Sequence, residues 1–194
     1  EIYVDECTIE HSEQFIDLLE TWDVPLFLSG HLHVQHCKRS EDNRGIWEMV
    51  TASLATPSCK YAILTYRDDR SFLYRTQSLD VEAWAKKNQC TEEDLLNFKQ
   101  FQTPFLRRVF YNQAIASLNE VPELTDSERE QMAQLYSLLK FHYYQGTAYQ
   151  VQELVRNDPA YELWQEDGMA TQQGEYFRYI LEDGKRDYNR LEVN

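Results

Sequence analysis

Leu26-Phe27-Leu28-Ser29-Gly30-His31-Leu32-His33-Val34-Gln35-His36 is the stretch that decides how the first part of this chain folds. An apolar run ends here in Gly-His-x-His, and three of the chain's five histidines lie in this stretch. On an extended segment, side chains at positions i and i+2 point to the same side, so His31 and His33 would offer imidazole nitrogens to one metal ion or to two adjacent ions. Gly30 would allow a sharp turn where the strand ends. We therefore predict a strand followed by two metal ligands, and the alternative is a histidine cluster that serves packing or solvation alone.

The residues just before this stretch favour a functional role for it. Residues 13–22 have the pattern of an amphipathic helix, and Val24-Pro25 then leads into the strand. Open α/β sheets place their chemistry at the carboxyl ends of buried strands. A helix that feeds such a strand therefore raises the expectation that polar groups at its end bind a ligand.

At this point the chain resembles the calcineurin-like metallophosphoesterases, over roughly residues 9 to 76. Leu28-Ser29-Gly30-His31-Leu32-His33 resembles the last metal motif of that family, which follows an apolar strand. Thr51-Ala52-Ser53-Leu54-Ala55-Thr56-Pro57, followed by Tyr61-Ala62-Ile63-Leu64, resembles the strand, turn and strand that close the second sheet of such domains.

The resemblance implies both a fold and an activity. The fold is α/β, with residues 1–79 as the C-terminal portion of a layered α-β-β-α metallophosphoesterase sandwich and residues 80–194 as an all-helical C-terminal region. The implied activity is metal-dependent phosphoester hydrolysis, in which two ions about 3.5–4 Å apart bind the phosphoryl oxygens and deprotonate a bridging water. His31 would bind one ion and His33 the other. Imidazole suits Mn, Fe, Zn or Ni, so the ligand type does not choose the metal.

The earlier metal motifs of that family are absent from this sequence. No Asp-x-His, Gly-Asp or Gly-Asn-His occurs, and His11 lies in the wrong context to be the family's lone histidine. The chain begins at Glu1 without an initiator Met, and the apolar residues Ile2-Tyr3-Val4 follow at once, without a polar tail before them. We therefore expect the remaining ligands on a missing N-terminal portion of the same domain, and we expect this chain to be inactive alone. The substrate class stays open beyond a phosphoester.

A self-sufficient zinc site is an alternative for His36 and Cys37, which extend the motif to His-x-His-x-x-His-Cys. The other cysteines form none of the closely spaced pairs that structural zinc sites use. The competing interpretation makes His36 a polar strand residue near the site and Cys37 a small buried residue.

Composition limits the classes of function. The chain has 194 residues, of which 42% are hydrophobic and 13% aromatic, so it can bury a real core. Its net charge of −14 works against nucleic acid as a partner, and the basic pairs Lys38-Arg39, Arg107-Arg108 and Lys185-Arg186 are isolated and favour solvated faces. Four scattered cysteines do not form a disulfide framework, and no apolar run is long enough for a transmembrane segment. Localisation and oligomeric state stay open.

Secondary structure signals change near residue 80. Before it, the sequence predicts strands, with turns at Asp42-Asn43-Arg44-Gly45, Pro57-Ser58 and Asp68-Asp69. The four predicted strands are Leu26–Ser29, Trp47–Ser53, Tyr61–Tyr66 and Ser71–Arg75.

After residue 80 we predict four to six helices. Capping boxes are expected at Thr91-Glu92-Glu93-Asp94 and Thr125-Asp126-Ser127-Glu128, and helix ends at Gly146 and Gly184. An apolar stripe recurs at helical spacing along Met132, Leu135, Tyr136, Leu139 and Tyr143.

Tyrosine is frequent in this region, and the chain has thirteen in all. Those of the last third are Tyr143, Tyr144, Tyr149, Tyr161, Tyr176, Tyr179 and Tyr188. Such side chains stack on sugars or bases, dock another subunit, or simply pack between helices. The alternative function is therefore a non-catalytic binding or oligomerisation module formed by the helical C-terminal region.

Overall fold

The computed structural model describes residues 9–39, 45–56 and 58–194. Several features of the sequence lie outside the described residues: the apolar entry Ile2-Tyr3-Val4, Cys7, most of the predicted turn at Asp42-Asn43-Arg44-Gly45, and Pro57. Within the described residues there are eight α-helices and two three-stranded sheets. The prediction of a mixed α/β fold is confirmed, while a metallophosphoesterase sandwich is not.

The first sheet contains β1 (Leu26–Ser29), β2 (His36–Arg39) and β3 (Trp47–Val50), in the order β1-β3-β2. β3 pairs in parallel with β1 and antiparallel with β2. The predicted strand at residues 26–29 is therefore confirmed with its bounds, whereas β2 was not predicted.

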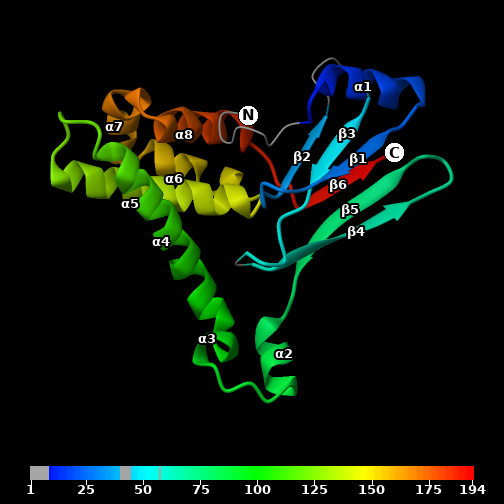
Figure 1. Cartoon of the computed structure of the whole chain (residues 1–194), viewed down its shortest axis with the longest axis horizontal. Helices are drawn as coiled ribbons and strands as arrows, with labels where there is room; N and C mark the ends of the chain where they lie inside the picture. The colour runs from blue at the N-terminus through cyan, green and yellow to red at the C-terminus, as the bar shows by residue number, and fades with distance from the viewer. Residues whose placement is uncertain (1–8, 40–44, 57) are drawn as a thin grey trace.

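The second sheet is antiparallel and contains β4 (Lys60–Tyr66), β5 (Phe72–Ser78) and β6 (Arg190–Val193), in that order. β6 comes from the end of the chain and pairs with β5, so in the sequence the whole helical region is inserted between two strands that are neighbours in the sheet (Figure 1). The division of the chain at residue 79 stays a prediction.

A shared core joins the faces of the two sheets. Cys37 and Met49 from the first sheet, Phe72 and Tyr74 from the second, and Tyr188 form a buried cluster. The helix α1 (Ser12–Thr21) covers the outer face of the first sheet, where the Phe15 and Phe27 rings meet edge to face with their centroids 5.2 Å apart. The strand-bearing part is thus layered as helix, sheet and sheet.

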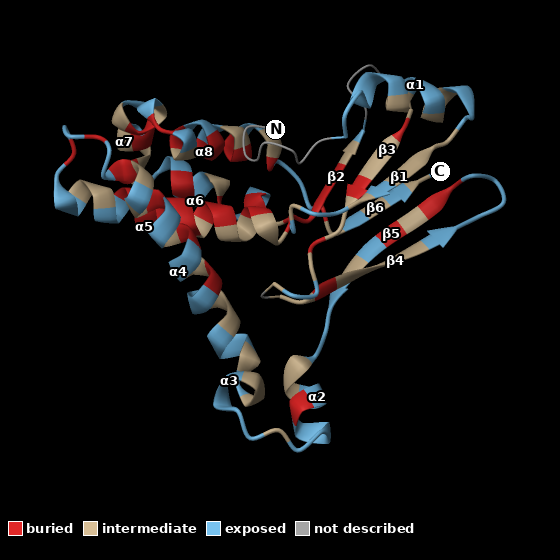
Figure 2. Cartoon of the chain, viewed as in Figure 1, coloured by how far each residue is buried: buried red, intermediate tan, exposed pale blue. Residues whose placement is uncertain are grey.

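The helical region begins with α2 and α3 and continues into the long helix α4, whose first half projects away from the rest of the molecule (Figure 1). Buried residues concentrate in α5 and α8, while much of the projecting part is exposed (Figure 2). Among the described residues, no helix combines the length and the apolar character that crossing a membrane requires. The elements are α2 (Val81–Lys87), α3 (Glu93–Leu96), α4 (Phe98–Leu118), α5 (Asp126–Tyr144), η1 (Ala148–Gln150), α6 (Gln152–Arg156), α7 (Ala160–Gln165), η2 (Asp167–Ala170) and α8 (Gln172–Asp183).

Trp164 is the largest side chain in the core of the helices, and it is completely buried. Its indole nitrogen donates to the Met132 carbonyl over 2.9 Å, and its ring stacks on Phe177 with centroids 5.1 Å apart. The apolar stripe predicted along α5 supplies much of this core, because all five of its residues are buried. Burial of such large side chains holds α5, α7 and α8 together.

Hydrogen bonds tie the helices to the sheets at the end of α5. The backbone N–H of the buried Gln35 donates to the Tyr144 carbonyl over 3.2 Å. The Lys60 ammonium of β4 donates to the Gln145 carbonyl and to Asn189 Oδ1, both over 2.6 Å. Since these bonds involve buried groups, they fix the helical region against both sheets.

One of the two predicted capping boxes is present. At the start of α5, Thr125 Oγ1 accepts from the Glu128 N–H, and the Glu128 carboxylate accepts from the Thr125 N–H. The box predicted at Thr91 is wrong, because α3 begins after Glu92 with no side-chain cap. The predicted helix ends at Gly146 and Gly184 are confirmed, since α5 ends two residues before Gly146 and α8 ends directly before Gly184.

Thr125→Ala should destabilise the protein by about 1 kcal/mol, because it removes a helix cap. Thr91→Ala is the matched control, since Thr91 caps no helix, and it should change the free energy of unfolding by less than roughly 0.5 kcal/mol. Urea denaturation of the two variants measures both values. Equal losses for the two variants would contradict the assignment of the cap.

Candidate functional site

His31 and His33 lie in a bend after β1 and not on an extended segment. Both have left-handed backbone conformations, with φ of 74° and 59°, and both side chains are exposed. The expectation that their side chains project to one side as on a strand is therefore wrong. His31 borders a cavity of about 480 Å³ beneath α1, and His33 does not. No group of three or more His, Cys, Asp or Glu within the described ranges is placed to hold a metal ion.

His36 and Cys37 point to opposite faces of β2, as neighbouring strand residues do. Cys37 is 2% exposed in the core between the sheets, and its thiol donates to the Tyr188 carbonyl over 3.4 Å. Burial raises the pKa of Cys37 to about 12, which disfavours the thiolate that a metal would need. The alternative of a zinc site at these two residues is wrong, and Cys37 is the small buried residue that the other interpretation predicted.

His36 faces the helices and pairs with the end of α8. Its Nε2 lies 2.6 Å from Asp183 Oδ2, and its ring packs on Tyr188 with centroids 4.2 Å apart. The Tyr143 hydroxyl donates to the same carboxylate oxygen over 3.3 Å. This cluster closes one end of a cavity between the first sheet and the helices.

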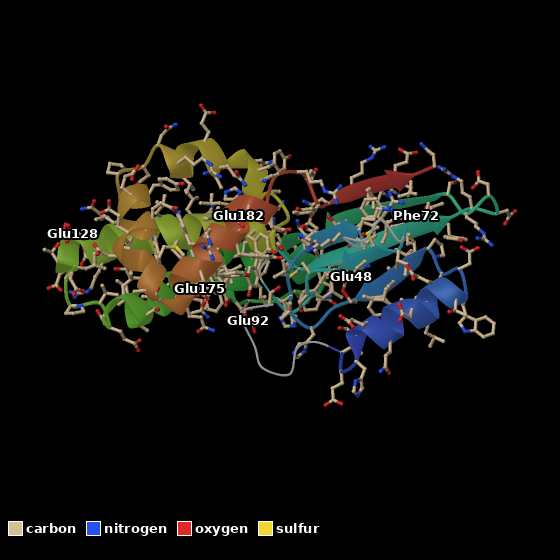
Figure 3. The ribbon with its side chains drawn as sticks, turned by 90° about the horizontal axis from the view of Figure 1, so that it is seen from above. Glu48, Phe72, Glu92, Glu128, Glu175 and Glu182 are labelled. Carbon is tan, nitrogen blue, oxygen red and sulfur yellow. The ribbon has the colours of Figure 1, made fainter. Side chains whose placement is uncertain are left out.

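We call this space the tyrosine cavity, and its volume is about 630 Å³. The outer face of the first sheet forms one wall, and α4, α5 and α8 form the other. Glu48 lies on the sheet side and Glu175 on α8 in the view from above (Figure 3). The lining residues of the sheet side are Leu32, Val34, His36, Lys38, Glu48 and Val50, and those of the helices are Gln113, Lys140, Tyr143, Tyr144, Gln172, Gln173, Tyr176 and Tyr179.

Three tyrosines form an aromatic cluster in this cavity. Tyr176 and Tyr179 stack with ring centroids 6.2 Å apart, and Tyr143 meets them edge to face at 5.8 and 6.3 Å. Burial raises the pKa of Tyr143 far above its usual range, so its hydroxyl stays neutral. The cluster presents aromatic faces and neutral hydroxyl groups to a ligand.

Lys140 is a buried cation in the wall of the cavity, with 4% of its surface exposed. Its ammonium donates to Gln113 Oε1 over 2.9 Å and to the Tyr136 hydroxyl over 3.1 Å. It also lies 5.0 Å from the ring centroids of both Phe110 and Tyr176. Burial lowers the pKa of Lys140 to about 7. Such a site favours an anionic ligand, which would offset the cost of a buried positive charge.

The lowered pKa of Lys140 predicts a pH dependence of stability. Folded Lys140 releases its proton near pH 7 and the unfolded amine near 10.5, so the unfolded chain binds more protons between these values. The free energy of unfolding should therefore rise with pH over this window. Burial also lowers the pKa of Lys60, to about 8, so Lys60 adds to the rise above that pH. The contribution of Lys140 is therefore best measured between pH 7 and pH 8. Urea denaturation should show a smaller rise in Lys140→Met, and equal slopes would contradict the prediction.

The sequence indicated part of this site. The tyrosines of the last third were noted as possible stacking groups, and Tyr143, Tyr176 and Tyr179 now lie together. Lys140 was missed, although it follows Tyr136 by four residues and therefore lies on the apolar face of α5. A lysine at a core position of an apolar stripe is the signal that would have found it.

Residues 80–187 match the model of a family described as the C-terminal domain of cyclic nucleotide phosphodiesterase. This segment is more than half of the chain. The chain belongs to this family. No curated protein matches the sequence. The helices that line the tyrosine cavity, α4, α5 and α8, all lie within the matched segment, so the cavity is built largely from the cyclic nucleotide phosphodiesterase domain.

The family match corrects the assignment that the resemblance gave. The matched family is the cyclic nucleotide phosphodiesterase C-terminal domain and not the calcineurin-like metallophosphoesterases, and it lies beyond residues 9–76. A dinuclear phosphoesterase centre as the function of this chain is not supported, because the described residues contain no group of three or more His, Cys, Asp or Glu that could hold a metal ion. Metal binding by His31 and His33, and two ions in the intact protein, stay predictions.

Proposed function

We propose that this chain is part of a cyclic nucleotide phosphodiesterase and that the tyrosine cavity binds the nucleotide. The family description names a phosphodiesterase of cyclic nucleotides, and the matched helices supply one wall of the cavity. The observation that carries the proposal is Lys140, a buried cation among aromatic rings at that wall. The alternative, a non-catalytic binding or oligomerisation module formed by the helical C-terminal region, stays a prediction.

The size of the cavity and its aromatic groups suit a nucleotide. Its volume of about 630 Å³ lies in the usual range of roughly 300–1,000 Å³ for small-molecule sites. Tyr179 is only partly buried, so it is the ring of the cluster on which a base would stack, a contact that every base can make. The amide groups of Gln113 and Gln173 border the same space and both donate and accept hydrogen bonds.

The charges of the cavity suit the single negative charge of a cyclic phosphodiester. Lys140 lies on the helical wall and Lys38 on the sheet wall, and the one carboxylate among the lining residues, Glu48, lies opposite Lys38 in the sheet. With Lys140 protonated, one positive charge is therefore in excess. A lysine ammonium binds phosphate oxygens as a point charge, and such charge-assisted bonds are stronger than neutral ones. Because the pKa of Lys140 is lowered to about 7, an anion that favours its protonated form should bind more tightly at pH 6 than at pH 8.

Titration calorimetry of the chain with 2′,3′-cyclic AMP tests this proposal. We expect saturable binding that Tyr179→Ala weakens by about tenfold, since stacking of one base is worth roughly 1–3 kcal/mol. Tyr149→Ala is the matched control, because Tyr149 is an exposed tyrosine of η1 that does not line the cavity. Absence of binding, or equal weakening by both variants, would contradict the proposal.

A further inference from the structure

A second cavity, of about 580 Å³, lies between α4 and α5 and shares no lining residue with the tyrosine cavity. We call it the arginine groove. Its lining residues are Thr103, Pro104, Arg107, Arg108, Tyr111, Asn112, Gln134 and Ser137. Two of them are cationic and none is acidic, in a chain whose net charge is −14. The groove is therefore a local site of positive charge.

The groove also offers neutral hydrogen-bond donors around the two guanidinium groups. Thr103 and Tyr111 carry hydroxyl groups and Asn112 carries an amide, while the Ser137 hydroxyl already donates to the Gln134 carbonyl over 2.8 Å. Within the described part of the chain, no ion pair joins Arg107 or Arg108 to a carboxylate. Two guanidinium groups beside several donors suit an oxyanion with more than one charge.

Arg107 has an unsatisfied donor. Its Nη2 donates to Ser137 Oγ over 3.2 Å and to the Gln134 carbonyl over 3.4 Å. Its Nε is the one buried side-chain polar atom of the described residues without a hydrogen-bond partner. Such atoms are rare in folded proteins, because they have lost their water without replacing it. Burial also lowers the pKa of Arg107, as expected for a guanidinium without a counter-ion.

An oxyanion in the groove would remove this cost. The Nε and Nη2 edge of a guanidinium binds two oxygens of one phosphoryl group at once. Arg107 lines the groove, and Arg108 lines it from the next position of α4. A planar pair of guanidinium groups matches a dianion better than a monoanion.

We propose that the arginine groove binds a phosphomonoester, with its phosphoryl dianion held by Arg107 and Arg108. The volume of about 580 Å³ exceeds what inorganic phosphate fills, whose size is close to a few water molecules at roughly 30 Å³ each, so an organic group occupies the rest. The proposal does not rest on nucleotide binding in the tyrosine cavity, because the two sites share no residue.

Ribose 5-phosphate is a suitable probe, since it carries a phosphomonoester and no base that stacks on tyrosine. Titration calorimetry of the whole chain should show saturable binding, and inorganic phosphate should bind more weakly. Arg107→Lys keeps the positive charge but loses the bidentate contact with the phosphoryl group, and Arg108→Gln removes the second positive charge. Each substitution should weaken the binding of ribose 5-phosphate by about tenfold, as expected for a lost hydrogen bond to a charged group.

Arg178→Gln is the matched control, because Arg178 is an exposed arginine of α8 outside the groove, and it should leave binding unchanged. Tyr179→Ala should also leave it unchanged, which separates this site from the tyrosine cavity. Arg107 links α4 to α5, so Arg108→Gln keeps the test valid if Arg107→Lys unfolds. The proposal would be overturned if ribose 5-phosphate did not bind, or if both arginine variants bound it as tightly as the wild type. Inorganic phosphate binding as tightly as ribose 5-phosphate would also overturn it.

Discussion

Gly174→Ala should destabilise the protein by about 3 kcal/mol, the upper range for overpacking of a closely packed site. A Cβ atom at Gly174 would lie 2.0 Å from the Gly168 carbonyl oxygen, 2.6 Å from the Gly168 carbonyl carbon and 3.0 Å from the Met169 Cα. All three are backbone atoms of η2, so no side-chain rotation relieves the clash. The better helix propensity of alanine, worth roughly 1 kcal/mol, does not offset it.

Gly30→Ala is the matched control for this substitution. A Cβ atom there would have no heavy atom within 4 Å, and Gly30 does not have a left-handed backbone. Its free energy of unfolding in urea should stay within roughly 0.5 kcal/mol of the wild type. Because α8 carries Tyr176 and Tyr179, Gly174→Ala should also weaken ligand binding in the tyrosine cavity. Wild-type stability of Gly174→Ala would show that α8 does not rest against η2.

Lys140→Met should weaken the binding of 2′,3′-cyclic AMP by about tenfold to a hundredfold, because a hydrogen bond to a charged group is worth roughly 1.5–3 kcal/mol. Methionine has a similar length and no charge, so it fills the space beside Phe110 and Tyr176. Burial disfavours the charged form of Lys140, which lowers its pKa to about 7. The variant should therefore be at least as stable as the wild type at pH 6.

Lys99→Met controls for the loss of a positive charge. Lys99 is exposed on α4, where its ammonium lies 3.9 Å from Glu82, and such surface pairs contribute little. Calorimetry at pH 6 and pH 8 should show unchanged affinity for this control at each pH. If Lys140→Met binds the nucleotide as tightly as Lys99→Met, the phosphate does not contact Lys140.

Local sequence signals were sufficient for some of the strands. Pro25 and Gly30 bound a continuous apolar run, and β1 has the predicted bounds. The hairpin of β4 and β5 was also found, because Asp68-Asp69 separates two runs rich in aromatic and aliphatic residues. β6 was missed because its four residues pair with a strand more than a hundred residues earlier, and such pairing leaves no local pattern.

The candidate site was also only partly predictable from local sequence signals. The Gly-His-x-His interpretation assumed an extended backbone, and the left-handed conformations of both histidines are set by the bend after β1, which periodicity does not reveal. Arg107 and Arg108 were interpreted as an isolated solvated pair, whereas the packing of α4 on α5 brings hydroxyl and amide groups around them. Composition did reveal the abundance of tyrosine, but only the fold brings Tyr143 of α5 beside Tyr176 and Tyr179 of α8.

Photolabelling with 8-azido-2′,3′-cyclic AMP, followed by peptide mapping, tests the central claim that the nucleotide occupies the tyrosine cavity. We predict that the label appears on peptides of α5 and α8 that contain Tyr143, Tyr176 or Tyr179, and that excess 2′,3′-cyclic AMP prevents the labelling. Label on the helix segment that contains Arg107 and Arg108, or labelling that excess nucleotide does not prevent, would contradict it.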